Sequence, residues 1–163
     1  MTLPFISPNE LAGKMAIQIG GLPLTYMTNF GTPSAVTSTT GKMMGFGAPT
    51  TGNATYAPQY STRLKVVWQG TAAYSGVAAP ATVLASYGTG TPPAYAATVT
   101  GTQVGLGFSN TIVAAAEATG FPFQITTFIT GLTVGTVYWM DLDVYTSTGT
   151  ITLTNVSLII EEV

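Results

Sequence analysis

The sequence predicts an all-β protein, an antiparallel sandwich or jelly roll. Several short segments alternate apolar and polar side chains with a period of two, which is typical of strands with one face in a core and the other toward solvent. Turns rich in Gly, Pro, Thr and Ser separate these segments, and no long amphipathic helical pattern occurs in the 163 residues. About eight to ten short strands are expected at this spacing.

Residues 1–19 are expected to form an N-terminal arm outside the β-domain of residues 20–163. Ser7, Pro8 and Glu10 supply the hydroxyl, the proline and the carboxylate of a capping box, which predicts a single helical turn. The arm carries apolar side chains that need a surface to cover them, so we expect it to dock on another protein. A plain N-terminal strand and tail is the alternative. The apolar side chains are Leu3, Phe5, Ile6 and Leu11.

The next segments read as short strands and long loops. Residues 14–28 give two strands around a Gly-Gly pair, residues 29–41 have loop composition, and residues 42–46 form a short strand. After a second loop, residues 62–70 show the strongest strand pattern of the first half, in which Leu64, Val66 and Trp68 share one side.

The middle of the chain, residues 71–120, is rich in Ala, Gly, Thr and Pro. We expect strands at residues 81–87, 94–99 and 109–115. The segment NTIVAAAEATG has helical propensity, but its neighbours are all β-like, which favours strand or loop. The pieces YGTG and GLG match neither phosphate-binding fingerprint and are interpreted as turns.

Residues 121–163 read as three consecutive strands. In the second of these, Tyr138 to Tyr145, large apolar side chains alternate with Trp139, Asp141 and Asp143, which predicts one buried and one wetter face. In the third, the apolar side chains change parity, which predicts a bulge near Asn155. The candidates for core and subunit contacts on these strands are Phe123, Ile125, Tyr138, Met140, Leu142, Val144, Val156, Leu158 and Ile160.

The composition is unusual for its low charge. Four basic and six acidic residues occur, a charged share of 6 % against the roughly 25 % of an ordinary domain. So few cations form no footprint for nucleic acid, and no partner of that kind is expected. A weakly charged surface favours burial between subunits, although a Thr- and Ser-rich surface that simply tolerates low charge is the alternative.

Targeting signals and reactive cysteines are not found in the sequence. Cysteine is absent, which leaves no disulfide or thiolate metal site. No signal peptide and no apolar run long enough for a membrane span is recognised, so we expect synthesis in a cytoplasm and no membrane partner.

The residues for catalysis are sparse. Histidine is absent, which removes the Ser-His and Cys-His nucleophile systems. Asp141 and Asp143 lie on one side of a strand and could serve acid/base chemistry or an ion, but a solvated face is the favoured interpretation. We expect no catalytic, cofactor or metal site.

Tyrosines are the other candidate ligand-binding residues. Their rings could stack on sugars along a groove, whereas covering strand faces and subunit contacts is the favoured role. They are Tyr26, Tyr56, Tyr60, Tyr74, Tyr87 and Tyr95.

Several segments resemble a recurrent module of bacteriophage virions. They are YGTGTPPAYAATVTGTQVG, PFQITTFITGLTVGTVYWMDLDV and the closing NVSLIIEE, with GKMMGFG and LKVVWQG before them. The chain is similar over most of residues 20–163 to the tumour-necrosis-factor/C1q-like trimeric jelly roll of phage head fibres, decoration proteins and tail-fibre tips.

This resemblance implies a homotrimer with a structural role and without active-site residues. We expect a capsid decoration, cement or head-fibre protein on the outside of the virion, with the arm of residues 1–19 anchored to the major capsid protein. The alternative is the receptor-binding tip of a tail fibre, with a host-surface glycan as its partner.

A second resemblance concerns the fold. The Leu132, Gly135 and Tyr138 spacing resembles the tyrosine corner of fibronectin type III domains, and LKVVW resembles their Trp-bearing strand. The span from Trp68 to Tyr138 is too long for that domain, which ranks this fold second.

Overall fold

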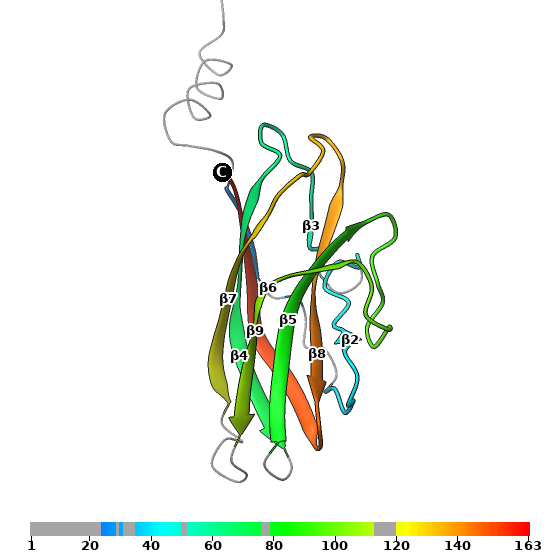
Figure 1. Cartoon of the computed structure of the whole chain (residues 1–163), viewed down its shortest axis with the longest axis vertical. Helices are drawn as coiled ribbons and strands as arrows, with labels where there is room; N and C mark the ends of the chain where they lie inside the picture. The colour runs from blue at the N-terminus through cyan, green and yellow to red at the C-terminus, as the bar shows by residue number, and fades with distance from the viewer. Residues whose placement is uncertain (1–23, 29, 31–34, 50–51, 76–78, 113–119) are drawn as a thin grey trace, which may run out of the picture.

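A computed structural model of the chain consists of two antiparallel β-sheets packed face to face (Figure 1). It describes residues 24–28, 30, 35–49, 52–75, 79–112 and 120–163. The strands are β1 (Leu24–Thr28), β2 (Lys42–Met43), β3 (Thr55–Tyr56), β4 (Leu64–Ser75), β5 (Ala79–Thr89), β6 (Thr102–Ile112), β7 (Phe121–Ile129), β8 (Tyr138–Thr146) and β9 (Thr150–Glu162).

The secondary structure confirms the prediction of an all-β protein. Over the described ranges the regular structure is strand, and none of it is helix. In the same ranges we find no helix with the length and apolar character that a membrane crossing needs. The predicted arm, with Leu3, Phe5, Ile6 and Leu11, lies outside the described residues, as does most of the ambiguous segment NTIVAAAEATG.

The strand order follows one rule along the whole chain. One sheet has the order β1-β9-β4-β7, and the other has β2-β8-β5-β6 with β3 also paired to β8. Strands from opposite ends of the chain pair in turn: β1 with β9, β2 and β3 with β8, β4 with β7, and β5 with β6. The two halves of the chain therefore pair antiparallel along their length, as the two arms of a long hairpin do, and the successive pairs alternate between the two sheets.

The core lies between the two sheets. Leu64, Val66 and Trp68 of β4 are buried while the residues between them are partly exposed, which confirms the alternation predicted for this strand. Trp68 packs against the rings of Phe30 and Phe46, with centroids 5.5 and 5.6 Å away. These inward side chains exclude water from both sheets.

The predicted bulge in the last strand is confirmed. The pairing of β4 with β9 shifts register between Gln69 and Thr71, opposite Asn155. Asn155 has a φ of 52°, a left-handed conformation that Asn tolerates better than most residues. Ile151 and Leu153 before the bulge and Val156 after it are all buried, so the bulge keeps the apolar side chains facing the core despite their change in parity.

The middle of the chain differs in part from its prediction. Strand β5 confirms the strand expected at residues 81–87, but YGTG belongs to its end and GLG lies inside β6, so neither is simply a turn. The strand expected at residues 94–99 is wrong: this segment is a loop that pairs at Thr98 alone, with Lys42. YGTG and GLG were interpreted as turns because of their glycines, but glycine inside a strand marks a bulge as readily as a turn.

Candidate functional site

Strand β8 is buried on both faces, which corrects the prediction of a wet stripe. The side chains of Asp141 and Asp143 are 0 % and 1 % exposed, and Trp139 is also buried. Residues 41–47, which contain the edge strand β2, run beside β8, and residues 94–98 hydrogen-bond to them; we call these two stretches together the covering segment. Met44 N–H donates to the Leu142 carbonyl at 2.9 Å, and Ala96 N–H donates to the Met43 carbonyl at 2.9 Å.

Asp141 fastens this covering segment to the sheet. Its carboxyl accepts hydrogen bonds from the N–H groups of Gly45 at 2.9 Å and Phe46 at 3.1 Å. A third comes from the N–H of Leu142 at 2.8 Å. Burial raises the pKa of Asp141 to about 7, against the opposing effect of these three donors.

Asp143 lies two residues further on the same strand and is tied to β6. Its Oδ2 accepts a 2.7 Å hydrogen bond from Gln103 Nε2, which reaches across β5. The buried Oδ1 has no hydrogen-bond partner, and neither has Ser86 Oγ on β5. Burial raises the pKa of Asp143, with the Gln103 hydrogen bond opposing it. A Cβ on Gly41 would collide with Asp143 Oδ1, so the covering segment needs glycine here.

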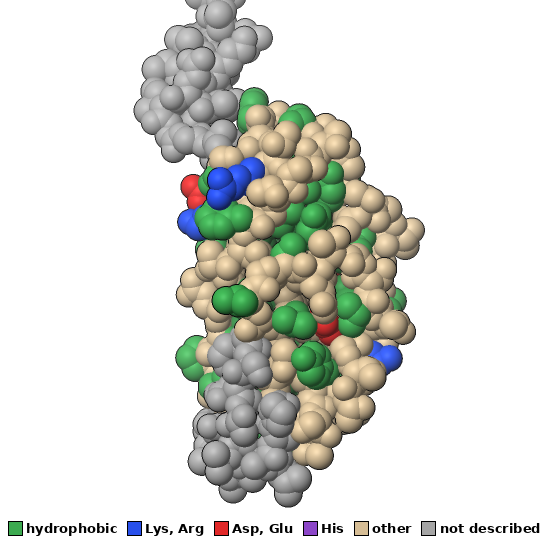
Figure 2. All heavy atoms as spheres, viewed as in Figure 1, with side chains coloured by type: hydrophobic (Ala, Val, Ile, Leu, Met, Phe, Trp, Pro, Cys, Tyr) green, Lys and Arg blue, Asp and Glu red, His purple; other side chains and the backbone are tan. Residues whose placement is uncertain are grey.

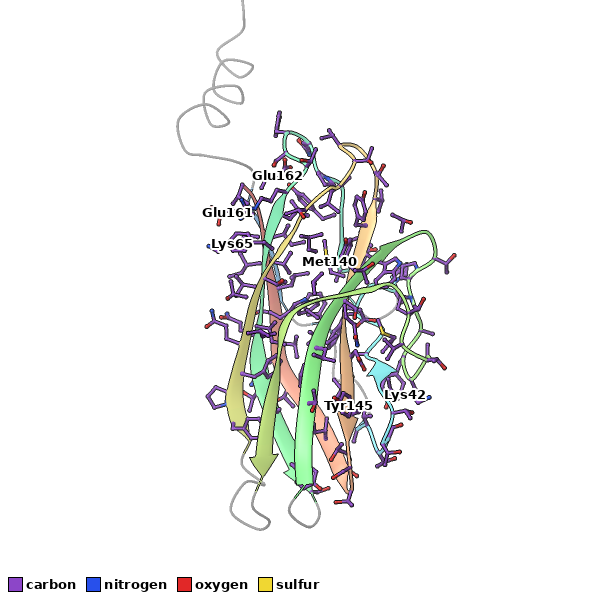
Figure 3. The ribbon with its side chains drawn as sticks, in the orientation of Figure 1. Lys42, Lys65, Met140, Tyr145, Glu161 and Glu162 are labelled. Atoms are coloured by element: carbon purple, nitrogen blue, oxygen red, sulfur yellow. The ribbon has the colours of Figure 1, made fainter. Side chains whose placement is uncertain are left out.

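The two carboxyls have a structural role in this arrangement. The part of the chain that the structure describes brings no three His, Cys, Asp or Glu side chains together where they could hold a metal ion. Asp141 uses both oxygens on backbone donors, and Gly41 packs over Asp143. Lys42 lies at the outer side of the covering segment (Figure 3). The cluster therefore ties the covering segment to β8 at the edge of the five-stranded sheet.

Glu162 performs a similar task at the other end of the molecule. It is 1 % exposed and accepts hydrogen bonds from Tyr56 Oη and from the N–H groups of Gln59, Tyr60 and Ser61, at 2.6 to 2.8 Å. Desolvation opposes its ionisation, but the four donors outweigh it and hold the pKa of Glu162 below its usual value. The last strand is thereby joined to the loop before β4.

The outer face of the four-stranded sheet carries little charge on its described residues. Its ionised side chains are at one end, where Lys65 pairs with Glu161 at 3.2 Å (Figure 3) and Arg63 lies over the Phe128 ring at 4.5 Å. The remaining outward side chains of its long strands are neutral. They include Val67, Gln69, Thr71, Gln124, Thr126, Thr154 and Ile159.

A hollow interrupts this face at the bulge. It has a volume of about 510 Å³ and is lined by Gln69, Gly70, Gln124 and Asn155 with neighbouring residues. The register shift opens the hollow because the two strands move apart where one residue is extra. The lining is neutral like the rest of the face.

The residues proposed from sequence for core and subunit contacts lie inside a single chain. All nine, from Phe123 to Ile160, belong to the core cluster between the sheets. Any contact between subunits must therefore use other side chains, those that alternate with these. The sequence pattern predicts which side chains of each strand point outward. It does not predict which outward face of the two sheets is left uncovered by the rest of the chain.

The tyrosines are dispersed over the described residues. Tyr56 and Tyr74 are buried, with hydroxyls that donate to Glu162 and to the Thr148 carbonyl at 2.8 and 2.5 Å. Tyr60 and Tyr95 are exposed on separate loops. They form no common groove.

Comparison with known proteins gives no family: no family model matches the sequence, and no curated protein matches it significantly. The fold and its surfaces therefore carry the functional argument.

Proposed function

We propose that this chain is a structural protein of a bacteriophage virion. It forms a homotrimeric jelly roll bound to the capsid exterior, as a decoration, cement or head-fibre protein. The observation that carries this proposal is the strand order of the two sheets, taken together with the module that the sequence resembles.

The strand pairing supports the jelly-roll fold. If the two-residue strands β2 and β3 are taken as one, eight strands fall into two sheets of four. The first strand then pairs with the last, the second with the seventh, the third with the sixth and the fourth with the fifth. A hairpin rolled into two layers has this pairing, and jelly rolls of this type are frequent in viral capsid proteins.

The outer face of the four-stranded sheet supports self-association. Burying a charge costs free energy unless the charge is paired, and here almost no charge would be buried. The one ion pair of this face, Lys65 with Glu161, is at its end, where both side chains are about two-fifths exposed. A neutral sheet face on a chain with 6 % charged residues is suited to lasting contact with another subunit.

The arm of residues 1–19 would attach the trimer to the major capsid protein. Three arms on one trimer bind together, because the first attachment raises the effective concentration of the other two. Leu3, Phe5, Ile6 and Leu11 would supply the apolar contacts.

Capsid binding by truncated protein tests this function. The full chain should bind capsids assembled without it, whereas a chain lacking residues 1–19 should remain folded and trimeric but no longer bind. Serine at Leu3, Phe5, Ile6 and Leu11 should act like the deletion, and alanine at Thr2, Ser7 and Asn9 is the matched control. Retained capsid binding by the truncated chain would refute the anchoring role. Binding to host cells in place of capsids would favour the tail-tip alternative.

A further inference from the structure

Leu106 is the most exposed large apolar side chain of the described residues, at 93 %. It lies on β6, an edge strand, in the middle of a nearly uncharged flank where β6 runs beside β7 (Figure 1). Most surface leucines are at least partly covered by their neighbours. Such complete exposure in the middle of a strand leaves its apolar surface available to a partner.

The backbone around Leu106 is built to hold it outward. Val83 pairs with Phe108 and Ala85 with Val104, so Leu84 alone faces the three residues 105–107. Gly105 has a φ of 75°, and a Cβ there would lie 2.8 Å from Thr127 Cβ. A Cβ on Gly107 would collide with the Leu84 side chain. Two glycines at positions that tolerate no other residue thus place one leucine at the top of a bulge.

An apolar patch that Leu106 of another copy could contact lies on the outer face of the four-stranded sheet. It lies at about the same position along the strands as Leu106. Val67 and Ile159 are paired across β4 and β9, and Val67 is also paired with Thr126 of β7. Gly105 contacts Thr127, the next residue of β7, which places Leu106 within about one residue of that level. Val67 and Ile159 are partly exposed neighbours on a face otherwise made mostly of Thr and Gln.

The position of a residue along the strand direction decides which residues of neighbouring subunits can meet. Rotation about an axis parallel to the strands leaves this position unchanged for every residue. A side chain on the flank of one subunit then meets the sheet face of the next subunit at that position. Repetition of such a head-to-tail contact closes a ring. Leu106 and the Val67 and Ile159 pair meet this condition within one chain.

We propose that Leu106 of one copy packs on Val67 and Ile159 of the next copy, and that this contact joins the subunits of the trimer. The inference rests on the proposed function only in the size of the ring. The partner is a second copy of this chain.

Charge and area agree with this occupant. The space-filling view of the β5, β6 and β7 side shows one charged group near Lys65, an acidic patch and a basic one toward Lys42, and mostly uncharged surface elsewhere (Figure 2). Contact between two mostly uncharged surfaces buries few ions. Four strands ~4.8 Å apart and about nine residues long, at ~3.3 Å per residue, span roughly 600 Å². This projection is of the order of the ~800 Å² that a stable interface buries on each partner.

Sedimentation equilibrium of the full chain and its variants tests the contact. We expect Leu106→Ser to weaken association roughly 10- to 100-fold, since a buried leucine side chain is lost from each interface. Leu106→Asp and Val67→Lys should each abolish it. Val137→Asp is the matched control, because Val137 is 58 % exposed on the loop between β7 and β8, away from the contact.

A paired substitution identifies the partner residue. The double variant Leu106→Asp with Val67→Lys places opposite charges together in every interface and should reassemble at low salt, whereas Leu106→Asp with Val137→Lys should not. A single cooperative thermal unfolding transition in each monomeric variant confirms that it remains folded, at a lower temperature than the associated wild type.

The outcomes separate this contact from the wider proposal. Wild-type trimers that persist after Leu106→Asp would overturn the contact and leave the trimeric function standing. A wild-type chain that remains monomeric at all concentrations would overturn both. Disassembly by Leu106→Asp without rescue by Val67→Lys would overturn the assignment of Val67 as the partner residue.

Discussion

Asp141 and Glu162 each hold a loop on a sheet by accepting backbone hydrogen bonds. Asp141 holds the covering segment on β8, and Glu162 holds the loop before β4 on β9. They differ in solvation and in donors, so the pKa of Asp141 is raised and that of Glu162 is lowered. With Asp143, three of the six acidic residues are thus used inside the molecule.

Substitution of Asp141 by Asn should destabilise the fold by about 1–3 kcal/mol. The amide nitrogen has no lone pair, so in either orientation it faces a backbone N–H donor from Gly45, or from Phe46 and Leu142. Urea unfolding at pH 5.5 measures the change. Asp143→Asn is the control and should cost less, because its Oδ1 already lacks a partner. Equal stability of Asp141→Asn and wild type would contradict the fastening role.

Stability should rise as pH falls from about 8 to about 5. The folded pKa of Asp141 is about 7 and its ordinary value is 3.8, so over this window the folded state binds the proton that the unfolded state releases. The two pH units of this window that lie below the folded pKa correspond to about 3 kcal/mol as an upper bound. Asp143 acts in the same direction. Urea unfolding across this range should show the rise in wild type and most of it lost in Asp141→Asn; a flat wild-type profile would contradict the assignment.

Acid should act in the opposite direction through Glu162. Its pKa is lowered from 4.5, so its contribution is present above that value and is lost as pH falls through the folded pKa. Glu162→Gln should destabilise the protein by about 2–3 kcal/mol near neutral pH, because four donors lose a charged acceptor. Thermal unfolding from pH 6 to pH 2 checks both, with the partly exposed Glu161→Gln as control. A Glu162→Gln variant with wild-type acid sensitivity would refute this role.

At the scale of the strand, two bulges shape the surfaces. The bulge at Asn155 opens the hollow on the four-stranded sheet, and the bulge at residues 105–107 displays Leu106. The first was predicted because its flanking apolar side chains change parity. The second was not, because a glycine on each side of a single leucine reads equally as a turn.

Two substitutions of Asn155 separate the contribution of its backbone conformation to stability from the contribution of its side-chain contacts. Asn155→Ala should cost about 1–2 kcal/mol, since the φ of 52° is unfavourable for a residue with a Cβ and without a local polar group. Asn155→Gly should be nearly neutral or stabilising. Chemical denaturation of both variants measures this difference, and an Ala variant as stable as the Gly variant would contradict the bulge geometry.

Strands with one apolar side can be predicted from the sequence. Alternation identified β4, β5, β7 and β9, because each has one apolar side in the core. The same rule failed on β8, where the covering segment encloses Asp141 and Asp143. That segment holds only two residues of regular strand, β2 at the sheet edge, and it is held by backbone hydrogen bonds that leave no periodic trace in sequence. Asp141 and Asp143 were therefore found as a pair but placed on the wrong kind of surface.

For the whole molecule, the neutral face of the four-stranded sheet predicts how association responds to salt. The proposed trimer, joined through apolar contacts, should depend little on salt, because screening acts on charges and few are present. Sedimentation of wild type at ~0.05 M and ~0.5 M salt should give association constants within a few fold. A decrease of more than tenfold at high salt would contradict an interface of this composition.

Immunogold labelling of phage particles tests the proposed capsid role. Gold-labelled antibody against this chain, applied to intact phage particles and viewed by electron microscopy, should mark the capsid surface at many regularly spaced sites. Label confined to the tail tip, or absent from intact particles, would contradict a capsid-bound structural role.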